Sequence, residues 1–378
     1  MQIPWFQLYG LVLIAGTALV LILTPLAQLL ARKLDIMDRP AGEKHKHHAH
    51  ATPLLGGAAM LCGWLAVLGG AFLVWHFASE EVRRELLHDY RGGIAAVLPR
   101  LGYLMAGAML AGVLGLADDV RGLKAHWKFL GQFLVALLAV GPGGVRISLF
   151  ITQPWIGFAL TVFWFMLLMN AINFFDNMDG LAAGTAAIAL ALFTLAGAIQ
   201  QQYFVASLSA LGTGCALGFW FYNYAPASIF MGDSGSHFLG YLLALSSAGT
   251  TYFTPEYSST RLPILIPLCI LLIPLFDTAA VTVIRTLNRK PFWVGDHNHI
   301  SHRFVKMGLS RKRAVQLVHL LCLLTGLSAL PMLWGSFATT VVIASQQILL
   351  LALVTVLQYA VRPPDVNAVV PPDRPERQ

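Results

Sequence analysis

Residues 170–184 read NAINFFDNMDGLAAG and set five amide and carboxylate side chains between two long apolar runs. If the first helix continued through the stretch, Asn173, Asp176 and Asp179 would share about a third of its circumference. Such groups are costly at membrane depth unless they pair, bind a cation or line a wet cavity. The stretch therefore predicts the floor of a site at the end of a membrane helix.

The composition around this stretch is that of an integral membrane protein. The 378 residues are 57% hydrophobic and 11% charged, with a mean hydropathy of +0.68, whereas soluble domains carry about a quarter charged residues. A spanning helix needs about 20 mostly apolar residues. Eleven segments are candidates, of which 129–141 is short: 7–31, 53–75, 98–117, 129–141, 156–172, 181–199, 203–222, 236–250, 262–284, 314–334 and 337–360. We predict an all-α, polytopic membrane protein with about 10–11 transmembrane helices.

The loops between these segments predict the orientation of the chain. Nineteen of the 25 Lys and Arg residues fall in one alternate set of loops and in the C-terminal tail, and the positive-inside rule makes that side cytoplasmic. The N-terminus is then outside. The net charge of +7 reflects this bias and contact with anionic lipid rather than nucleic acid. Residues 1–361 form one expected catalytic domain, and the Pro-rich tail 362–378 is expected to be disordered and cytoplasmic.

Isolated aspartates mark the predicted cytoplasmic loops. Adjacent Asp118 and Asp119 repel one another unless a cation or a Lys offsets them, and Trp127 with Lys128 fits an interfacial belt. Asp233 begins an apolar helix in the turn MGDSGS, with no basic neighbour in the sequence. That placement suits an Mg²⁺ ligand, an N-cap, or a helix start that holds an anion.

Three further features of these loops are open to more than one interpretation. Lys44, in the His-rich first loop, fits either a phosphate contact or a basic juxtamembrane loop. Asp277, with Arg285 eight residues on, fits a structural ion pair, a cap or a functional role. The HNHISHR run, with His299, His302 and Arg303, fits phosphate contact or acid–base work. Carboxylates for a divalent cation and cationic groups for phosphate oxygens together indicate phosphoryl transfer.

At these residues the chain resembles the polyprenyl-phosphate N-acetylhexosamine-1-phosphate transferases. Five motifs carry the resemblance in order: DRPAGEK (38–44) with PLLGG (53–57), LADDVRGL (116–123), NAINFFDNMDGLAAG (170–184), FMGDSGS (230–236) and HISHR (299–303). The resemblance implies transfer of a sugar 1-phosphate from a UDP-N-acetylhexosamine to undecaprenyl phosphate with release of UMP. It implies Mg²⁺, or Mn²⁺, as cofactor and the bacterial inner membrane as location, and it leaves a homodimer open.

The resemblance also implies a role for each motif residue. Asp118 and Asp119 match the catalytic pair, with Lys44 and His299 at phosphate-contacting positions. Asp233 and Asn173 match metal-holding positions. Asp179 and Phe230 match the uracil-binding positions, and Asp176 lies close to the metal-holding residues. The further substrate-binding candidates are Asn170, His302 and Arg303.

Competing functions are recognisable by their own motifs. The HHHFE run of the MurNAc-pentapeptide branch is missing from the last loop, which favours GlcNAc as the sugar and a lipid-linked envelope glycan as the product. A CDP-alcohol phosphotransferase would need Arg where Ala183 stands. A transporter would place its acids near the midplane and show an inverted repeat, whereas these acids lie at span ends.

Overall fold

The fold is almost entirely helical, as predicted. The computed structural model describes residues 5–39, 51–77, 79, 91–147, 153–254, 258–291 and 298–360. The long elements are α1 (Trp5–Lys33), α2 (Gly56–Phe77), α4 (Arg91–Arg121), α5 (Ala125–Val140), α6 (Pro154–Phe175), α7 (Leu181–Ile199), α8 (Tyr203–Asn223), α9 (Gly232–Gly249), α11 (Leu272–Leu287), α13 (Arg311–Ala329) and α14 (Phe337–Ala360). The short ones are β1 (Met37–Asp38), β2 (Thr52–Pro53), α10 (Ile266–Ile270), α12 (Ile300–Lys306) and two 3₁₀ turns, Leu262–Leu265 and Leu330–Leu333. Lys44 and the tail 362–378 lie outside the described residues.

Each predicted segment coincides with a helix, but fewer of them qualify as spans than expected. Within the described residues, eight helices are long and apolar enough to cross a membrane, and nine if a bent pair counts as one span. The two that do not qualify are α5, which has 16 residues, and α9. The protein is therefore a multi-pass membrane protein with a smaller set of unambiguous spans.

Helix α9 does not qualify as a membrane span because it lies inside the bundle, away from lipid. Every residue from Ser234 to Ala248 is buried, so small and polar residues replace the apolar ones that lipid would require. A Cβ on Gly115 of α4 would lie 2.2 Å from the Asp233 carbonyl oxygen, and one on Gly57 of α2 would lie 2.1 Å from the Gly235 nitrogen. Two neighbouring backbones thus press directly on the first turn of α9.

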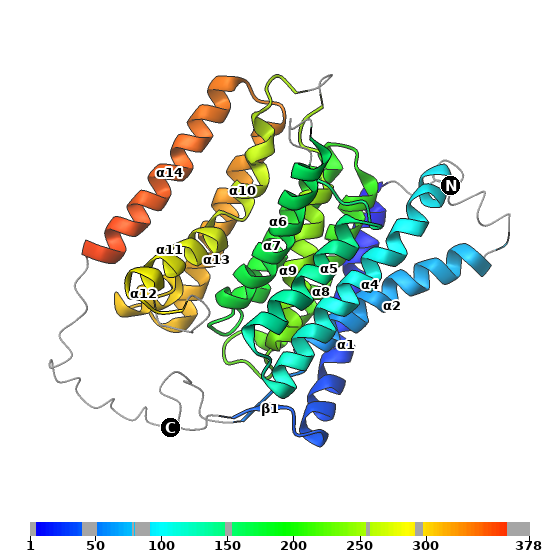
Figure 1. Cartoon of the computed structure of the whole chain (residues 1–378), viewed down its shortest axis with the longest axis horizontal. Coiled ribbons are helices and arrows are strands. Elements are labelled where there is room, and N and C mark those ends of the chain that lie inside the picture. Colours follow the sequence, from blue (N-terminus) through cyan, green and yellow to red (C-terminus); the bar gives the residue numbers. More distant parts are fainter. Residues whose placement is uncertain are drawn as a thin grey trace, which may run out of the picture.

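The segment 262–284 is broken rather than one straight span. Helix α10, with its 3₁₀ turn, meets α11 at an angle of 72° around Leu271, and Pro267 and Pro274 flank the break and weaken helical hydrogen bonding there. Beyond it, α11 buries a single stripe that includes Asp277 and ends at Arg285. In Figure 1, α11 and α12 lie toward the lower left, and α14 stands at the left edge of the bundle.

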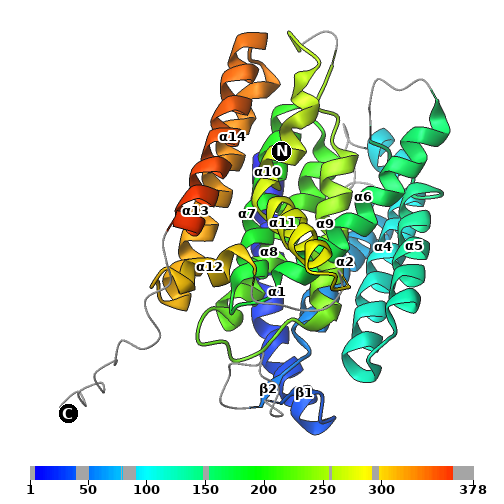
Figure 2. The same cartoon turned by 60° about the vertical axis from the view of Figure 1, so that its left-hand side comes forward.

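The polar motifs gather at one end of the bundle. Strands β1 and β2 pair antiparallel at the foot of α1 (Figure 2). The backbone N–H of Phe230 donates to the Pro53 carbonyl, and the Gly56 N–H donates to the Phe230 carbonyl. The first loop and the turn before α9 are therefore joined directly. Helix α6 ends at Phe175, so the helix does not continue through Asp179, and Asp176 and Asp179 lie in the turn that follows.

Candidate active site

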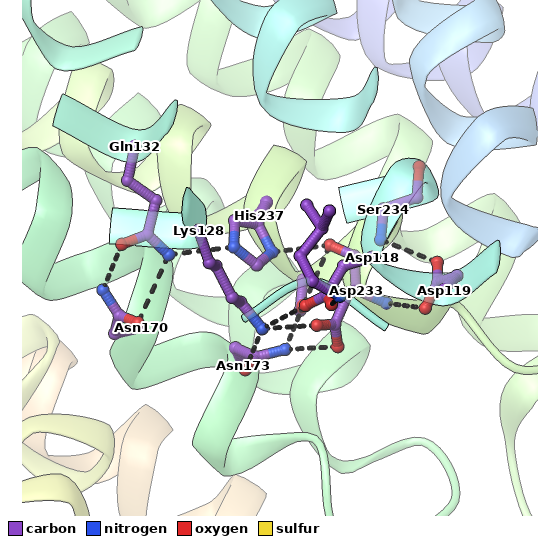
Figure 3. Close-up of polar contacts among 11 residues, drawn as sticks. Asp118, Asp119, Lys128, Gln132, Asn170, Asn173, Asp233, Ser234 and His237 are labelled. Atoms are coloured by element: carbon purple, nitrogen blue, oxygen red, sulfur yellow. Dashed lines mark hydrogen bonds and ion pairs between the residues drawn. The ribbon is translucent and has the colours of Figure 1, made fainter. Parts of the chain in front are cut away.

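Lys128 of α5 is the centre of the site. Its Nζ lies 2.8 Å from Asp118 Oδ2, 2.5 Å from Asp233 Oδ2 and 3.4 Å from Asn173 Oδ1. The Asn173 amide in turn donates to Asp233 Oδ1 at 2.6 Å. Figure 3 shows these side chains converging from α4, α5, α6 and α9. The Lys128 ammonium thus sits where three oxygen atoms from distant parts of the chain meet.

The two adjacent aspartates have different partners. Asp118 contacts Lys128 and accepts from the Leu123 N–H, at 2.7 Å. Asp119 turns to α9, where its two oxygens accept from the backbone N–H groups of Asp233 at 2.7 Å and Ser234 at 3.1 Å. Asp119 therefore caps a helix from another part of the chain and fixes the backbone that carries Asp233.

A glycine is required where Asp119 meets α9. Gly232 has φ +66°, and a Cβ there would lie 2.5 Å from Asp119 Oδ2. The sequence suggested that this helix start could hold an external anion. In the structure, the anion there is the Asp119 carboxylate of the chain itself. The N-cap interpretation of Asp233 or Ser234 is also wrong, because Met231 is the N-cap and the Ser234 hydroxyl donates to the Gly112 carbonyl.

A buried amide and imidazole network supports Asp233 from behind. Asn170 and Gln132 exchange two amide hydrogen bonds, of 2.7 and 3.2 Å, and Gln132 Nε2 lies 2.9 Å from His237 Nε2. His237 Nδ1 lies 2.7 Å from the Asp233 carbonyl, which can only accept. The imidazole is therefore neutral, with its proton on Nδ1. Asn170, predicted to bind substrate, has both polar atoms in this network.

The turn between α6 and α7 holds the remaining acids of the opening stretch. Asp179 Oδ2 accepts from the Ala227 N–H at 2.9 Å, and the Gly180 N–H donates to Asn223. Asp176 is half-buried, and burial, followed by the nearby Asp233, Asp119 and Asp179 carboxylates, raises the pKa of its carboxyl to about 8. This carboxyl shares an electrostatic environment with the Lys128 cluster.

A second cluster lies on α11 and α12. His299 Nδ1 lies 2.6 Å from Asp277 Oδ2, and the Ile300 N–H donates to Asp277 Oδ1 at 2.6 Å. Arg285 Nη2 lies 3.5 Å from His299 Nε2, and its guanidinium is 5.3 Å from the Phe174 ring centre. Asp277 thus pairs with His299, and the predicted ion pair with Arg285 is replaced by an Asp–His–Arg chain.

The two clusters meet at the 176–180 turn, because the Ser301 hydroxyl donates to Asn177 Oδ1 at 2.6 Å. His302 lies beside His299, with ring centres 6.3 Å apart, and Arg303 Nε donates to the Asn298 carbonyl. The half-buried Phe230 lies at the turn before α9. The roles of all these residues toward a substrate stay predictions.

Lys128, Gln132 and His237 were not identified as site residues from the sequence. The sequence places Lys128 in an interfacial belt with Trp127, whereas its ammonium pairs with Asp118 and Asp233 inside the site. No basic residue stands near Asp233 in the sequence to signal this partner. A signal was present, since Lys128 and Gln132 stand four residues apart in an apolar helix and so share one face. Their partners on α9, Asp233 for Lys128 and His237 for Gln132, are each 105 residues further on, and only packing reveals them.

The oxygen atoms around Lys128 fit a hard divalent cation. No group of three His, Cys, Asp or Glu side chains able to hold a metal occurs among the described residues. Mg²⁺ does not require one, because it commonly takes one or two carboxylates and completes its shell with water and substrate phosphate. Asp233, Asn173 and Asp118 supply oxygen donors at the place where the Lys128 ammonium now balances their charge.

A helical membrane bundle with oxygen ligands and a lysine at one end defines a membrane-embedded enzyme site of the phosphoryl-transfer type. Residues 101–250 match the model of glycosyl transferase family 4. The chain belongs to this family, as the similarity to its curated relatives also shows.

Those relatives cover most of the chain. A probable undecaprenyl-phosphate N-acetylglucosaminyl 1-phosphate transferase of Bacillus subtilis is 34% identical over 319 residues, which cover 82% of this chain and 81% of the relative. A decaprenyl-phosphate N-acetylglucosaminephosphotransferase of Mycobacterium leprae is 33% identical over 322 residues, covering 79% and 77%. A phospho-N-acetylmuramoyl-pentapeptide-transferase of Bacillus cytotoxicus is 31% identical over 257 residues, covering 62% and 74%.

Proposed function

We propose that the protein transfers N-acetylglucosamine 1-phosphate from UDP-N-acetylglucosamine to undecaprenyl phosphate, releasing UMP. The observation that carries this proposal is the cation position made by Asp118, Asp233 and Asn173 around Lys128. Both proposed substrates carry negatively charged phosphate, which a cation bound at this position would neutralise. A site at the end of a membrane bundle is accessible to the lipid substrate. The names of the similar proteins support the same reaction.

The residues have distinct roles in this proposal. A lipid phosphate oxygen forms a bond to the sugar-bearing phosphorus of the nucleotide, and the bond from that phosphorus to the UMP oxygen breaks. Mg²⁺, or Mn²⁺, when held by Asp233 and Asn173, supplies charge neutralisation at the diphosphate. Lys128 adds a positive charge suited to phosphate, and Asp118 is the carboxylate of the pair that faces Lys128 and the lipid phosphate.

The nucleotide end is assigned to the turn beside α9. Asp179 and Phe230 would hold the uracil, as acceptor and stacking ring. The Asp179 side chain already fixes the loop that leads to Phe230, through the Ala227 N–H. Lys44, outside the described residues, is proposed to contact the phosphates as its motif implies. Strand β2, which follows it in the sequence, is hydrogen-bonded to Phe230.

N-acetylglucosamine is preferred over MurNAc-pentapeptide as the transferred group. The MurNAc-pentapeptide relative aligns with 62% of this chain, against 82% for the undecaprenyl-phosphate relative, and the HHHFE run is missing. The transporter alternative has no support, because Asp118 and Asp233 both pair with Lys128 at one end of the bundle.

The positive-inside bias supports a bacterial inner-membrane location with the N-terminus outside and the site facing the cytoplasm, where UDP-sugars are available. The product would start a lipid-linked glycan of the cell envelope.

Light scattering of the purified protein tests for a homodimer.

The decisive experiment is an assay of the purified protein with undecaprenyl phosphate and a panel of UDP-sugars. We expect UMP and lipid-linked GlcNAc-diphosphate with UDP-GlcNAc, loss of both on chelation, and recovery with Mg²⁺ or Mn²⁺. Turnover of UDP-MurNAc-pentapeptide alone would replace the sugar assignment. No UMP with any donor would refute the reaction.

A further inference from the structure

The Asp277 carboxylate is buried on helix α11, and each of its two oxygens accepts a hydrogen bond. Its side chain is 2% exposed, and its two oxygens accept from two different donors in the segment that follows the α11–α12 connection. One donor is the His299 ring and the other is the Ile300 N–H, at the first residue of α12. A carboxylate serves two donors in this way, whereas a carboxamide has only one acceptor oxygen.

These contacts define the tautomer of His299. A carboxylate accepts, so the ring proton lies on Nδ1, and the guanidinium of Arg285 can only donate, so Nε2 accepts. The His299 ring is itself 3% exposed, and its Nε2 edge faces the guanidinium that stacks on Phe174, the residue that follows Asn173 in α6. The carboxylate thus determines which nitrogen is directed toward the end of α6.

The same carboxylate determines where the HISHR segment lies. Helix α12 has seven residues, too few to hold its own position by helix formation. It is tied to the 176–180 turn by Ser301 and to α11 by Asp277. Arg285, buried on α11 like Asp277, lies over the Phe174 ring in the last turn of α6.

We propose that Asp277 is a positioning residue for His299: it locks the imidazole with the proton on Nδ1 and anchors α12 so that the Nε2 edge faces the end of α6 that carries Asn173 and Asp176. This rests on the proposed function, in which His299 acts at the substrate phosphates. Asp277 has no contact with substrate in this scheme and acts through His299.

The test compares Asp277→Asn, His299→Gln and the double variant in UMP release from UDP-GlcNAc. Each single variant is expected to lose about 100-fold in kcat, as for other residues that orient a functional imidazole, and the double variant is expected to lose no more than His299→Gln alone. The matched control is Thr278→Val, also buried, whose hydroxyl donates only within α11, to the Pro274 carbonyl. It should retain wild-type kcat.

A second measurement reports on the tautomer itself. ¹⁵N spectra of histidine-labelled protein, with His299→Gln to identify the His299 signals, should show Nδ1 protonated and Nε2 unprotonated, and Asp277→Asn should change this pattern. Multiplying losses in the double variant, or a proton on Nε2 in the wild type, would overturn the inference. If the wild type releases no UMP from any donor, the proposed function fails while the spectra still decide the tautomer.

Discussion

Two aspartates, Asp119 and Asp277, perform the same structural task in the two halves of the site. One half is the Lys128 cluster with Asp233, and the other is the α11–α12 cluster with His299. Each caps a helix other than its own: Asp119 of α4 caps α9, and Asp277 of α11 caps α12, the next helix along the chain. Each also places one functional side chain, Asp233 in the first case and His299 in the second. The difference lies in what else holds the capped helix.

Helix α9 is held by packing as well as by its cap. It is buried along its length, and Gly57 and Gly115 bring two backbones against its first turn. Helix α12 has one short apolar face, with Ile300 and Phe304 buried, and relies on side-chain hydrogen bonds for its orientation. We infer that the half with Asp233 is rigid, and that the half with His299 is sensitive to loss of a single bond.

The largest loss of UMP release is expected when the negative charge of Asp233, in the rigid half of the site, is removed. Asp233→Asn leaves the packing intact but removes the carboxylate that faces both Lys128 and the cation position. UMP release should fall by about 1000-fold or more, the cost of losing a main electrostatic group in phosphoryl transfer. The control is Asp35→Asn, an exposed aspartate paired with Arg39. An Asp233→Asn enzyme with normal turnover would contradict the whole site assignment.

The next effect should come from Lys128→Met. Without the ammonium, the carboxylates of Asp118 and Asp233 face one another uncompensated, and the phosphate loses a positive contact. We expect a loss of about 100- to 1000-fold in kcat/KM for the UDP-sugar. Lys124→Met, an exposed lysine at the start of the same helix, is the control. Equal turnover in the two variants would mean that Lys128 is only a structural counter-ion.

Lys128 also illustrates how far the sequence alone could go. Apolar runs predicted the helices, since each run must cross or fill the membrane core, and the motifs located Asp118, Asp233 and Asn173. The pairing of Lys128 with Asp233, and of Asp277 with His299, depends on which helix faces come together, and no local pattern records that. The segment 262–284 was predicted as a single span although it contains Pro263, Pro267 and Pro274, and the 72° angle between its two helices follows from packing.

Asp119→Asn separates the two adjacent acids. The amide keeps one acceptor for α9 but loses the charge at the helix start and one N–H bond, which should cost about 1–2 kcal/mol of stability. A shift of Asp233 would lower kcat by about tenfold to 100-fold. Asp118→Asn should leave the melting temperature nearly unchanged while lowering kcat. If thermal unfolding shows the reverse order, Asp119 is not the cap that supports α9.

The smallest effect is expected at the junction between the first loop and α9. Phe230→Ala removes the ring but not the backbone bonds to Pro53 and Gly56, so the rigid half should keep its geometry. The KM for UDP-GlcNAc should rise about tenfold, the cost of one aromatic stacking contact, with kcat at saturation nearly unchanged. The exposed Phe221→Ala, 71% exposed on α8, is the matched control. An unchanged KM would remove Phe230 from the uracil site, whereas a fall in kcat would show that the ring supports α9 rather than the nucleotide.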